Sequence, residues 1–318
     1  MIALLQRGLR AGFMRAEAVF NAAFGDKLNP LYHLGPIAFF LFWVIGATGL
    51  VLYAFFDTSV AGAWRSVEAI TQGGWGAGGV IRTVHRHASD AMLLVVLLHA
   101  ARYFAFDRLR GFRWFSWVSG VALLVLVYVA GANGYMLPWD RLAQFVTQSS
   151  FEWFDWLPGF GGTLSRNFIA PEHVGDRLFS LLVFVHIGVP LATLALIWVH
   201  VQRVPKAATQ PPRPIAAALS LTLLLLAIAA PVVSQGPADL RSVPEALAFD
   251  WFLLPLYPLV MLWPAGAVWA LVLGAGAVLV LLPWLPPRCA SKTAATGASN
   301  SRVKSIHGTP AGTSSPTA

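Results

Sequence analysis

The chain has 318 residues, of which 57% are hydrophobic and only 11% are charged, and its net charge is +8. Its mean hydropathy of +0.65 is too high for a soluble domain and indicates a protein embedded in lipid. A single cysteine, Cys289, excludes a disulfide within the chain and a metal cluster held by several thiolates.

The first 30 residues mix charged and apolar side chains. The charged ones are Arg7, Arg10, Arg15, Glu17, Asp26 and Lys27. This segment lacks the uninterrupted apolar core and small-residue cleavage site of a signal peptide. We therefore predict that residues 1–30 form an amphipathic helix at the membrane surface.

Six apolar stretches follow, each long enough to cross about 30 Å of hydrocarbon as a helix. They cover residues 34–56, 80–106, 113–133, 176–202, 214–234 and 263–286. The fold class predicted from them is an all-α membrane protein. After the last stretch, residues 288–318 are rich in Ser, Thr, Ala, Gly and Pro, and we expect this tail to be disordered.

Arginine and lysine gather in alternate connections. The N-terminal segment, the loops 102–113 and 203–213 and the tail are basic, whereas the connections 57–79, 134–175 and 235–262 hold many acids and few bases. Basic loops stay on the cytoplasmic side, so we expect both termini to be cytoplasmic, in a bacterial cytoplasmic (inner) membrane. This topology and contact with anionic lipid account for the positive charge, and nucleic-acid binding is not expected.

Two histidine pairs share one spacing: His85 with His99, and His186 with His200. Fourteen positions along a helix return a side chain to nearly the same face, ~21 Å further on. Four imidazoles from two facing helices make two bis-histidine sites at two depths. A zinc ion needs three or four ligands at one point, so this arrangement favours two haem irons. The remaining histidines, His33, His87, His173 and His307, are not expected to be ligands.

Glycines repeat the same interval in the first and third apolar stretches. They are Gly35 and Gly49, then Gly120 and Gly134. Small residues in membrane helices often mark close helix packing. At the depth of the histidines they also leave room for a flat porphyrin against the backbone, which explains why the two intervals are equal.

Several motifs point to one family. They are Arg82-Thr-Val-His85-Arg86, Leu98-His99-Ala-Ala-Arg102, Gly134-Tyr-Met-Leu-Pro-Trp139-Asp140 and His186-Ile-Gly-Val-Pro190, followed by His200. Over roughly residues 20–204 the chain resembles cytochrome b of the quinol-oxidising cytochrome bc and bf complexes. The resemblance implies a four-helix bundle (31–204) with two non-covalent b haems. His85 and His186 then ligate the outer haem and His99 and His200 the inner one, and Arg82 and Arg102 pair with haem propionates.

The C-terminal region, residues 205–287, resembles the family less closely and is expected to contain two helices. The family has Pro-Glu-Trp-Tyr and then Phe-Leu-Pro at its outer quinol-oxidation pocket, whereas this chain has Phe249-Asp250-Trp251-Phe252-Leu253-Leu254-Pro255. The resemblance implies that Asp250 accepts a quinol proton beside Trp251. Alternatively, Asp250 simply begins the next segment at the interface.

Two further departures concern the quinone sites. The family's inner-site histidine falls on Lys206, which does not titrate in the same range, so a complete Q-cycle is not implied. The chain has six predicted spans where respiratory cytochrome b has eight. In the family, the aromatic connection 134–175 contains short surface helices that cap the outer pocket and dock the iron–sulfur partner.

The sequence therefore predicts a dihaem cytochrome b that carries electrons across the bilayer, as the electron-transfer subunit of a quinol-oxidising or quinone-reducing complex. Its expected partners are an iron–sulfur protein, a cytochrome c or another oxidoreductase subunit, and the family suggests a homodimer. An alternative is a haem-containing membrane anchor that conducts electrons for a periplasmic or cytoplasmic oxidoreductase. A third interpretation is a haem-free transporter or proton channel, although the inverted repeats and broken helices of many transporters are not evident.

Overall fold

The computed structural model describes residues 2–73, 76–170, 173–204, 207–242 and 246–285. These residues form helices, turns and loops, with one isolated β-bridge between Asp140 and Pro237. The all-α class predicted from the sequence is therefore confirmed. Lys206 and the predicted disordered tail, 288–318, lie outside the described residues.

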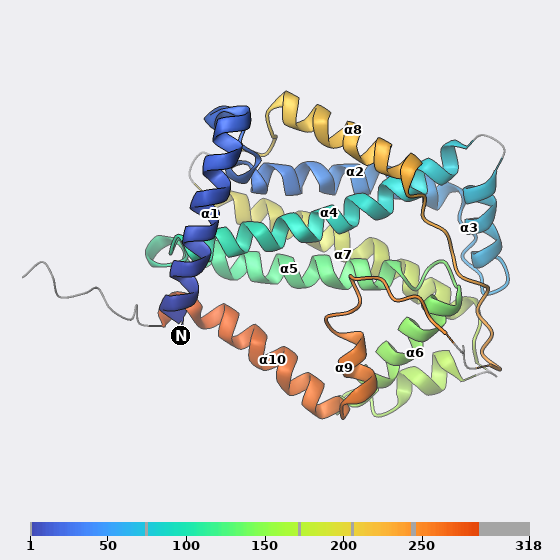
Figure 1. Ribbon diagram of the computed structural model, residues 1–318. Helices are drawn as coiled ribbons and strands as arrows, with labels where there is room; N and C mark the ends of the chain where they lie inside the picture. The colour runs from blue at the N-terminus through green and yellow to red at the C-terminus, as the bar shows by residue number, and fades with distance from the viewer. Residues whose placement is uncertain (1, 74–75, 171–172, 205–206, 243–245, 286–318) are drawn as a thin grey trace, which may run out of the picture.

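The helices follow one another as a bundle with additions at both ends (Figure 1). Their bounds are α1 Ile2–Phe24, α2 Leu34–Phe55, α3 Ala63–Gln72, α4 Ala77–Ala105, α5 Trp114–Gly134, α6 Arg141–Asp155, α7 Asp176–Gln202, α8 Arg213–Ala229, α9 Tyr257–Leu262 and α10 Ala265–Leu281. Short 3-10 or π turns are η1 Asp26–Leu28, η2 Pro30–Tyr32, η3 Gly111–Arg113, η4 Ser165–Ile169 and η5 Leu282–Trp284. Helices α2, α4, α5 and α7 run side by side (Figure 1).

Five helical segments of the described chain are long and apolar enough to span a membrane: α2, α4, α7, η3 with α5, and α10 with η5. The remaining predicted span, 214–234, corresponds to the apolar helix α8, which has 17 residues and is therefore only about 25 Å long. It ends earlier than expected because Pro231 follows Ala230 and proline disfavours helical geometry in the residue before it.

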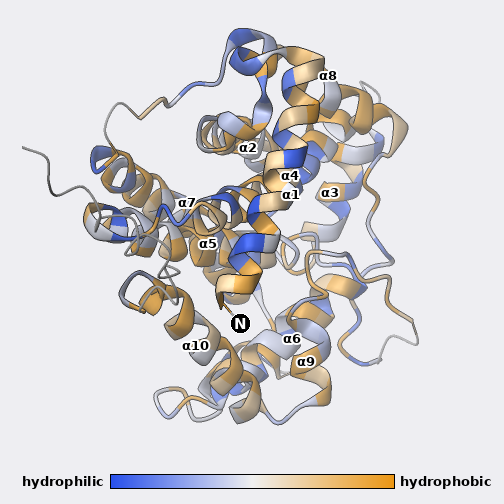
Figure 2. Cartoon of the chain, turned by 60° about the vertical axis from the view of Figure 1, so that its left-hand side comes forward, coloured by the Kyte–Doolittle hydropathy of each residue, from blue (hydrophilic) through white to orange (hydrophobic). Residues whose placement is uncertain are grey.

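Large apolar side chains face outward on these helices. Examples are Leu50, Phe55, Phe184, Trp198, Ile228 and Leu273. Figure 2 shows the apolar colour on α5, α7 and α10. A soluble monomer rarely exposes so much contiguous apolar surface, whereas lipid covers it in a membrane. The chain is therefore an integral membrane protein.

Helices pack mainly as two pairs, α2 with α4 and α5 with α7. Helix α8 covers α4, and α10 lies against α5. Ile37, Leu41 and Met92 form a core between α2 and α4, and Leu223 of α8 joins it. A second, larger core lies at the end of the bundle where α6 and α9 pack, and Phe252 is buried there.

Helix α1 lies across the opposite end of the bundle (Figure 1). No described side chain on it is fully buried. It is tied to the bundle by Glu17, which pairs with Arg102 of α4 at 2.8 Å, and by Gln6, which donates to the Phe104 carbonyl. This position suits a helix at the membrane surface, as the sequence predicts for residues 1–30.

Two helices were not predicted from the sequence. Helix α3 lies in the connection 57–79 and packs against α4, and α9 is a short helix of the region 205–287 in addition to the two predicted there. Both are short, so neither carries a pattern long enough to separate a helix from a loop.

The segment after α8 returns to the end of the bundle near α3 and α6 and is held there by buried polar side chains. Val232 N–H donates to Thr83 Oγ1, Gln235 N–H donates to Asp140 Oδ2, and Asp239 N–H donates to Gln144 Oε1. These bonds align the C-terminal region with the four-helix bundle.

Asp140 is expected to contribute strongly to stability. It caps α6 by accepting from Ala143 N–H at 2.8 Å, and its other oxygen accepts from Gln235 N–H at 2.9 Å. Asp140→Ala removes both acceptors and should lower the free energy of unfolding by about 2–4 kcal/mol. Thermal unfolding in detergent measures this loss. Asp26→Ala, at an exposed position in η1, should leave the midpoint unchanged, and equal midpoints for both variants would contradict the assignment.

Candidate cofactor site

Each of the four predicted ligands packs against one of the four predicted glycines. A Cβ atom at Gly49 would lie 3.0 Å from His85 Cε1, and one at Gly35 would lie 3.4 Å from His99 Cε1. Between α5 and α7 the same relation holds. A Cβ atom at Gly134 would lie 3.0 Å from His186 Cε1, and one at Gly120 would lie 3.5 Å from His200 Cε1.

This contact gives the equal intervals a further reason beside the one we predicted. That the glycines leave room for a porphyrin stays a prediction, and in the structure each glycine leaves room for the edge of an imidazole. Two helices carry histidines and two carry glycines, and each histidine–glycine pair joins neighbouring helices. The interval of fourteen therefore recurs because contacting residues lie at equal depth.

Hydrogen bonds orient the His85 ring. Its Nδ1 lies 3.1 Å from the Ile45 carbonyl and 3.1 Å from Thr48 Oγ1. A carbonyl oxygen only accepts, so Nδ1 carries the proton and donates. The lone pair is then on Nε2, the nitrogen free to bind a metal ion. Such a bond on the second nitrogen is what fixes the tautomer of metal-binding histidines.

His200 has the same arrangement on the other helix pair. Ser119 donates its hydroxyl proton to the Phe115 carbonyl at 2.8 Å, so its oxygen accepts from His200 Nδ1, also at 2.8 Å. Thr48 and Ser119 both directly precede a contacting glycine. Our sequence reasoning missed them, although Thr-Gly and Ser-Gly pairs in apolar spans were a usable signal.

The separation of His85 and His186 would suit two ligands of one metal ion. Their ring centroids lie 6.4 Å apart, and the ring planes are inclined by 64°. Metal–imidazole nitrogen bonds of about 2.0–2.1 Å place the centroids of two rings across one ion about 6 Å apart. Among the described residues, no group of three or more His, Cys, Asp or Glu side chains is arranged to hold a metal ion. A cofactor that supplies its own four nitrogens, such as haem, fits this donor set.

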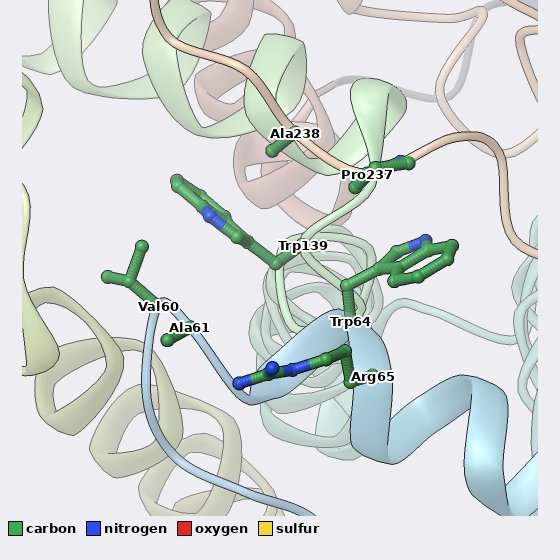
Figure 3. A pocket seen from close by; sticks show the side chains of 7 residues that line it. All are labelled: Val60, Ala61, Trp64, Arg65, Trp139, Pro237 and Ala238. Carbon is green, nitrogen blue, oxygen red and sulfur yellow. The ribbon is translucent and has the colours of Figure 1, made fainter.

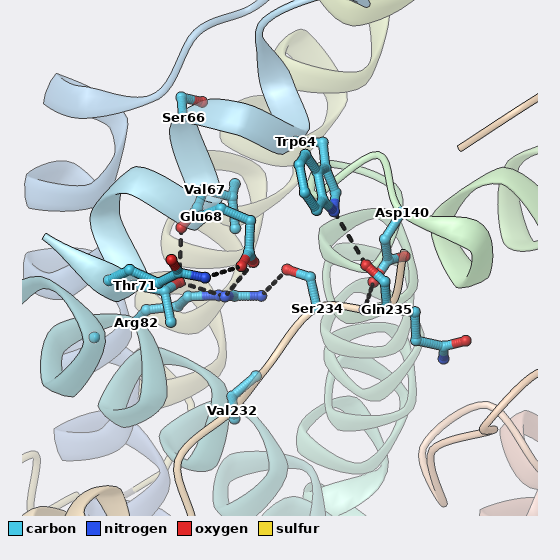
Figure 4. A network of polar contacts seen from close by, with 12 residues as sticks. Trp64, Ser66, Val67, Glu68, Thr71, Arg82, Asp140, Val232, Ser234 and Gln235 are labelled. Carbon is cyan, nitrogen blue, oxygen red and sulfur yellow. Dashed lines mark hydrogen bonds and ion pairs between the residues drawn. The ribbon is translucent and has the colours of Figure 1, made fainter. Parts of the chain in front are cut away.

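Arg82, predicted to bind a propionate of the outer haem, lies in a polar network at the α3 end of α4 (Figure 4). Its guanidinium is 3.6 Å from Glu68 Oε1, and it donates to Thr71 Oγ1 and Ser234 Oγ. These partners come from α3 and from the segment after α8. Sequence reasoning did not find them because they are 11 to 152 positions from Arg82.

Arg102, the predicted propionate partner of the inner haem, lies at the other end of α4. It pairs with Glu17, and its guanidinium carbon lies 5.3 Å from the Tyr32 ring centroid and 5.2 Å from that of Phe106. The two arginines thus mark the two ends of the histidine-bearing helix, each beside an acid that the sequence did not single out.

Asp250 and Trp251, the predicted quinol-site residues, lie near the same end of α4 as His85. Asp250 Oδ2 is 2.5 Å from Arg86 Nη2, and Trp251 is 38% exposed. Phe252 is fully buried, packs over Gly131 and stacks on Tyr128 with parallel rings 5.1 Å apart. The segment is therefore anchored to α5 by Phe252 and to α4 by Asp250.

Tyr257 contributes a second buried polar contact to this region. Its hydroxyl lies 2.8 Å from Ser150 Oγ of α6. Burial raises the pKa of Tyr257 to about 12, although the Ser150 hydrogen bond opposes the shift. The phenol therefore stays protonated near neutral pH and acts as a hydrogen-bonding anchor for α9.

A pocket of 390 Å³ lies between the start of α3, Trp139 and the segment at Pro237 (Figure 3). Trp64 and Arg65 of α3 line one side of it. None of the predicted site residues that the structure describes is among its lining residues. It is therefore separate from the histidine sites.

The histidines that we did not expect to be ligands lie elsewhere. His33 precedes α2 and contacts the Lys27 carbonyl, and His87 Nε2 lies 2.9 Å from the Ala230 carbonyl. His173 is in the loop before α7, and His307 lies outside the described residues.

Comparison with known proteins identifies the family. The model of the family described as Cytochrome b/b6/petB matches residues 19–207, more than half of the chain. The chain belongs to the cytochrome b family. It is therefore a membrane protein of the haem-binding, electron-transferring kind.

Relatives of this cytochrome b match over a segment of similar length. Cytochrome b6 of Heterocapsa triquetra is 32% identical over 196 residues, which cover 58% of this chain and 86% of the relative. Cytochrome b6 of Porphyra purpurea is 31% identical over 192 residues, with the same two shares. The family model ends at residue 207, so the C-terminal region beyond the bundle lies outside the family match.

Its fold also resembles a solved structure titled "Hyperthermophilic respiratory Complex III". The TM-score is 0.67 at 18% identity, and the match covers 85% of this chain and 80% of the other. This likeness shows a shared fold over most of both chains. The fold predicted from the sequence, a four-helix bundle with further transmembrane helices, is confirmed at that level.

Proposed function

We propose that this cytochrome b holds two b haems and carries electrons across the membrane between a quinone pool and a partner redox protein. The observation that carries the proposal is the arrangement of four histidines, each against a glycine of the neighbouring helix, at two depths of one bundle. In this proposal His85 and His186 serve the outer haem, and His99 and His200 serve the inner one.

The residues around these histidines have complementary roles. When bound, each haem would supply one-electron redox chemistry. The Ile45 carbonyl with Thr48, and Ser119, keep Nδ1 protonated, so that Nε2 of His85 and of His200 would be free to bind the haem iron. Arg82 and Arg102 are the cations that would bind the haem propionates. Each now pairs with an acid, Glu68 or Glu17.

The outer reaction centres on Asp250 in this proposal. Its carboxylate is 32% exposed and lies beside the exposed ring of Trp251, so a quinol hydroxyl can approach both. Asp250 accepts the proton from the quinol, and Phe252 holds the segment against α5 by aromatic stacking.

We further propose that the protein resides in a bacterial cytoplasmic membrane with both termini cytoplasmic. The helix ends next to α1 carry the basic loops around Arg108 and Arg203, which supports this orientation. An iron–sulfur protein or a cytochrome c is the redox partner we expect, in a bc-type assembly that includes a second copy of this chain.

A haem count followed by reduction with quinol tests the proposal. Pyridine extraction of the purified chain should yield two b haems, and a quinol added in place of dithionite should reduce them. Two haems that quinol does not reduce would favour the alternative of a conduit fed by a partner oxidoreductase. No extractable haem would contradict the proposal. The family match gives no support to a haem-free transporter.

The role of Asp250 has its own expected result. Asp250→Asn removes the proton acceptor and should slow quinol-dependent haem reduction by about a hundredfold, since positioned bases contribute 10²–10⁴. Stopped-flow absorbance measures the rate, and the dithionite-reduced spectrum should stay unchanged. Glu152→Gln, at an exposed acid of α6, is the matched control. A normal rate in Asp250→Asn would mean that Asp250 only begins its segment.

A further inference from the structure

Arg86, the residue after His85, is held by two carboxylates from different parts of the chain. Its Nη1 lies 2.8 Å from Asp90 Oδ1, one turn further along α4, and its Nη2 lies 2.5 Å from Asp250 Oδ2. The contact with Asp250 is an ion pair by distance, without hydrogen-bond geometry. The guanidinium carbon also lies 4.1 Å from the centroid of the Tyr135 ring. Sequence reasoning considered Asp250 alone.

The charges of this group do not balance. Arg86 contributes one positive charge, whereas Asp90 and Asp250 contribute two negative charges when both are ionised. The Arg86, Asp90 and Asp250 side chains are only 19%, 17% and 32% exposed, so solvent compensates the extra charge poorly. The two carboxylates therefore share one cation.

The surroundings contain few other charges that could alter this balance. His87 is the further titratable side chain near Asp90, and its Nε2 must donate to the Ala230 carbonyl because that oxygen only accepts. The ring of Tyr135 lies against the Arg86 guanidinium, and the ring of Phe252 packs beside the Tyr135 ring. Aromatic rings thus lie beside the group, and Asp250 is its most exposed member.

We propose that Asp90, Arg86 and Asp250 act as one proton-binding group, in which Asp90 neutralises Arg86 and so leaves Asp250 free to bind and release a proton. This inference rests on the proposed quinol oxidation. For each electron that the quinol would give up to a bound b haem, one quinol O–H bond breaks and one O–H bond forms on Asp250. The group changes from net −1 to net 0 and returns when Asp250 releases the proton outward. Arg86 and Asp90 are positioning residues, and Asp250 touches the substrate.

Two substitutions should shift the pH dependence in opposite directions. In Asp90→Asn, Arg86 is free to hold Asp250 as a carboxylate. The pH below which the rate of quinol-dependent haem reduction falls should therefore be lower by about one unit. In Arg86→Gln, Asp250 loses the cation that it shares with Asp90. The pH below which the reduction rate falls should therefore be higher by a similar amount. A merely structural defect would lower the rate without opposite shifts.

The experiment measures the reduction rate against pH for these variants, with Glu152→Gln as control and Asp90→Glu as the conservative variant expected to restore the original profile. Shifts in the same direction, or none, would overturn the proposal. Infrared titration of the carboxylic-acid signal follows the same group without quinol. A wild-type signal that disappears in Asp250→Asn and titrates at lower pH in Asp90→Asn supports the proton-binding group even if quinol fails to reduce the haems, and an unaltered signal in both variants refutes it.

Discussion

Replacement of His186 with leucine should reduce the haem content of the purified chain from two per chain to one. The ring centroids of His186 and His85 lie 6.4 Å apart, so removal of either imidazole would leave one protein ligand for the outer haem that we propose. A b haem has no covalent bond to the protein and depends on both ligands. The inner pair, His99 and His200, lies on the same helices about 21 Å away and should be unaffected.

Pyridine extraction and the dithionite difference spectrum measure this loss. His87→Leu is the matched control, because His87 lies two residues from a predicted ligand but contacts the Ala230 carbonyl. That variant should retain both haems. Equal haem contents in His186→Leu and the wild type would disprove the assignment of the outer ligand pair.

A second large loss of haem is expected when Gly49, which supplies no ligand atom, is replaced by a larger residue. A Cβ at Gly49 already lies 3.0 Å from His85 Cε1, so Gly49→Leu should push the imidazole out of position. Overpacking of this kind costs about 1–3 kcal/mol, and a ring displaced by a leucine no longer meets the geometry of a metal ligand. We expect Gly49→Leu to lose the outer haem although all four histidines remain.

Gly46 provides a control on the same helix, three residues earlier. No atom lies within 4 Å of a Cβ built at Gly46 in the described structure, and Gly46 is exposed to the lipid side. Gly46→Leu should therefore keep two haems, whereas Gly49→Leu keeps one. If Gly46→Leu also loses a haem, helix packing in general, and not the contact with His85, is responsible. Haem content and the reduced spectrum of both variants decide between these explanations.

The histidine and glycine intervals were informative because they are local. An α-helix has a fixed rotation per residue, so residues fourteen positions apart share a face whatever the rest of the protein does. The apolar stretches are local in the same sense, since a helix must satisfy its own backbone in lipid. For this reason the histidine-bearing spans 80–106 and 176–202 correspond closely to α4 and α7.

Predictions were less accurate where the pattern is short or broken. Helix α8 ends before Pro231, and α3 and α9 were not foreseen, because a few turns carry too little periodicity. The contact partners of the four glycines were also not predicted, since this required knowing which helices are neighbours. Only the packing of α2 on α4 and of α5 on α7 shows that each glycine contacts an imidazole edge.

The sequence by itself determined the membrane setting, the number of apolar helical segments and the matched depths of four histidines and four glycines. These depend on composition and on the helical repeat. The tertiary structure decided which acid meets which arginine: Glu17 meets Arg102, Glu68 meets Arg82, and Asp250 meets Arg86. Those partners come from different helices or connecting segments, and Asp250 lies more than 160 positions from Arg86. Ion pairs across such separations depend on how the whole chain packs, and no local periodicity specifies them.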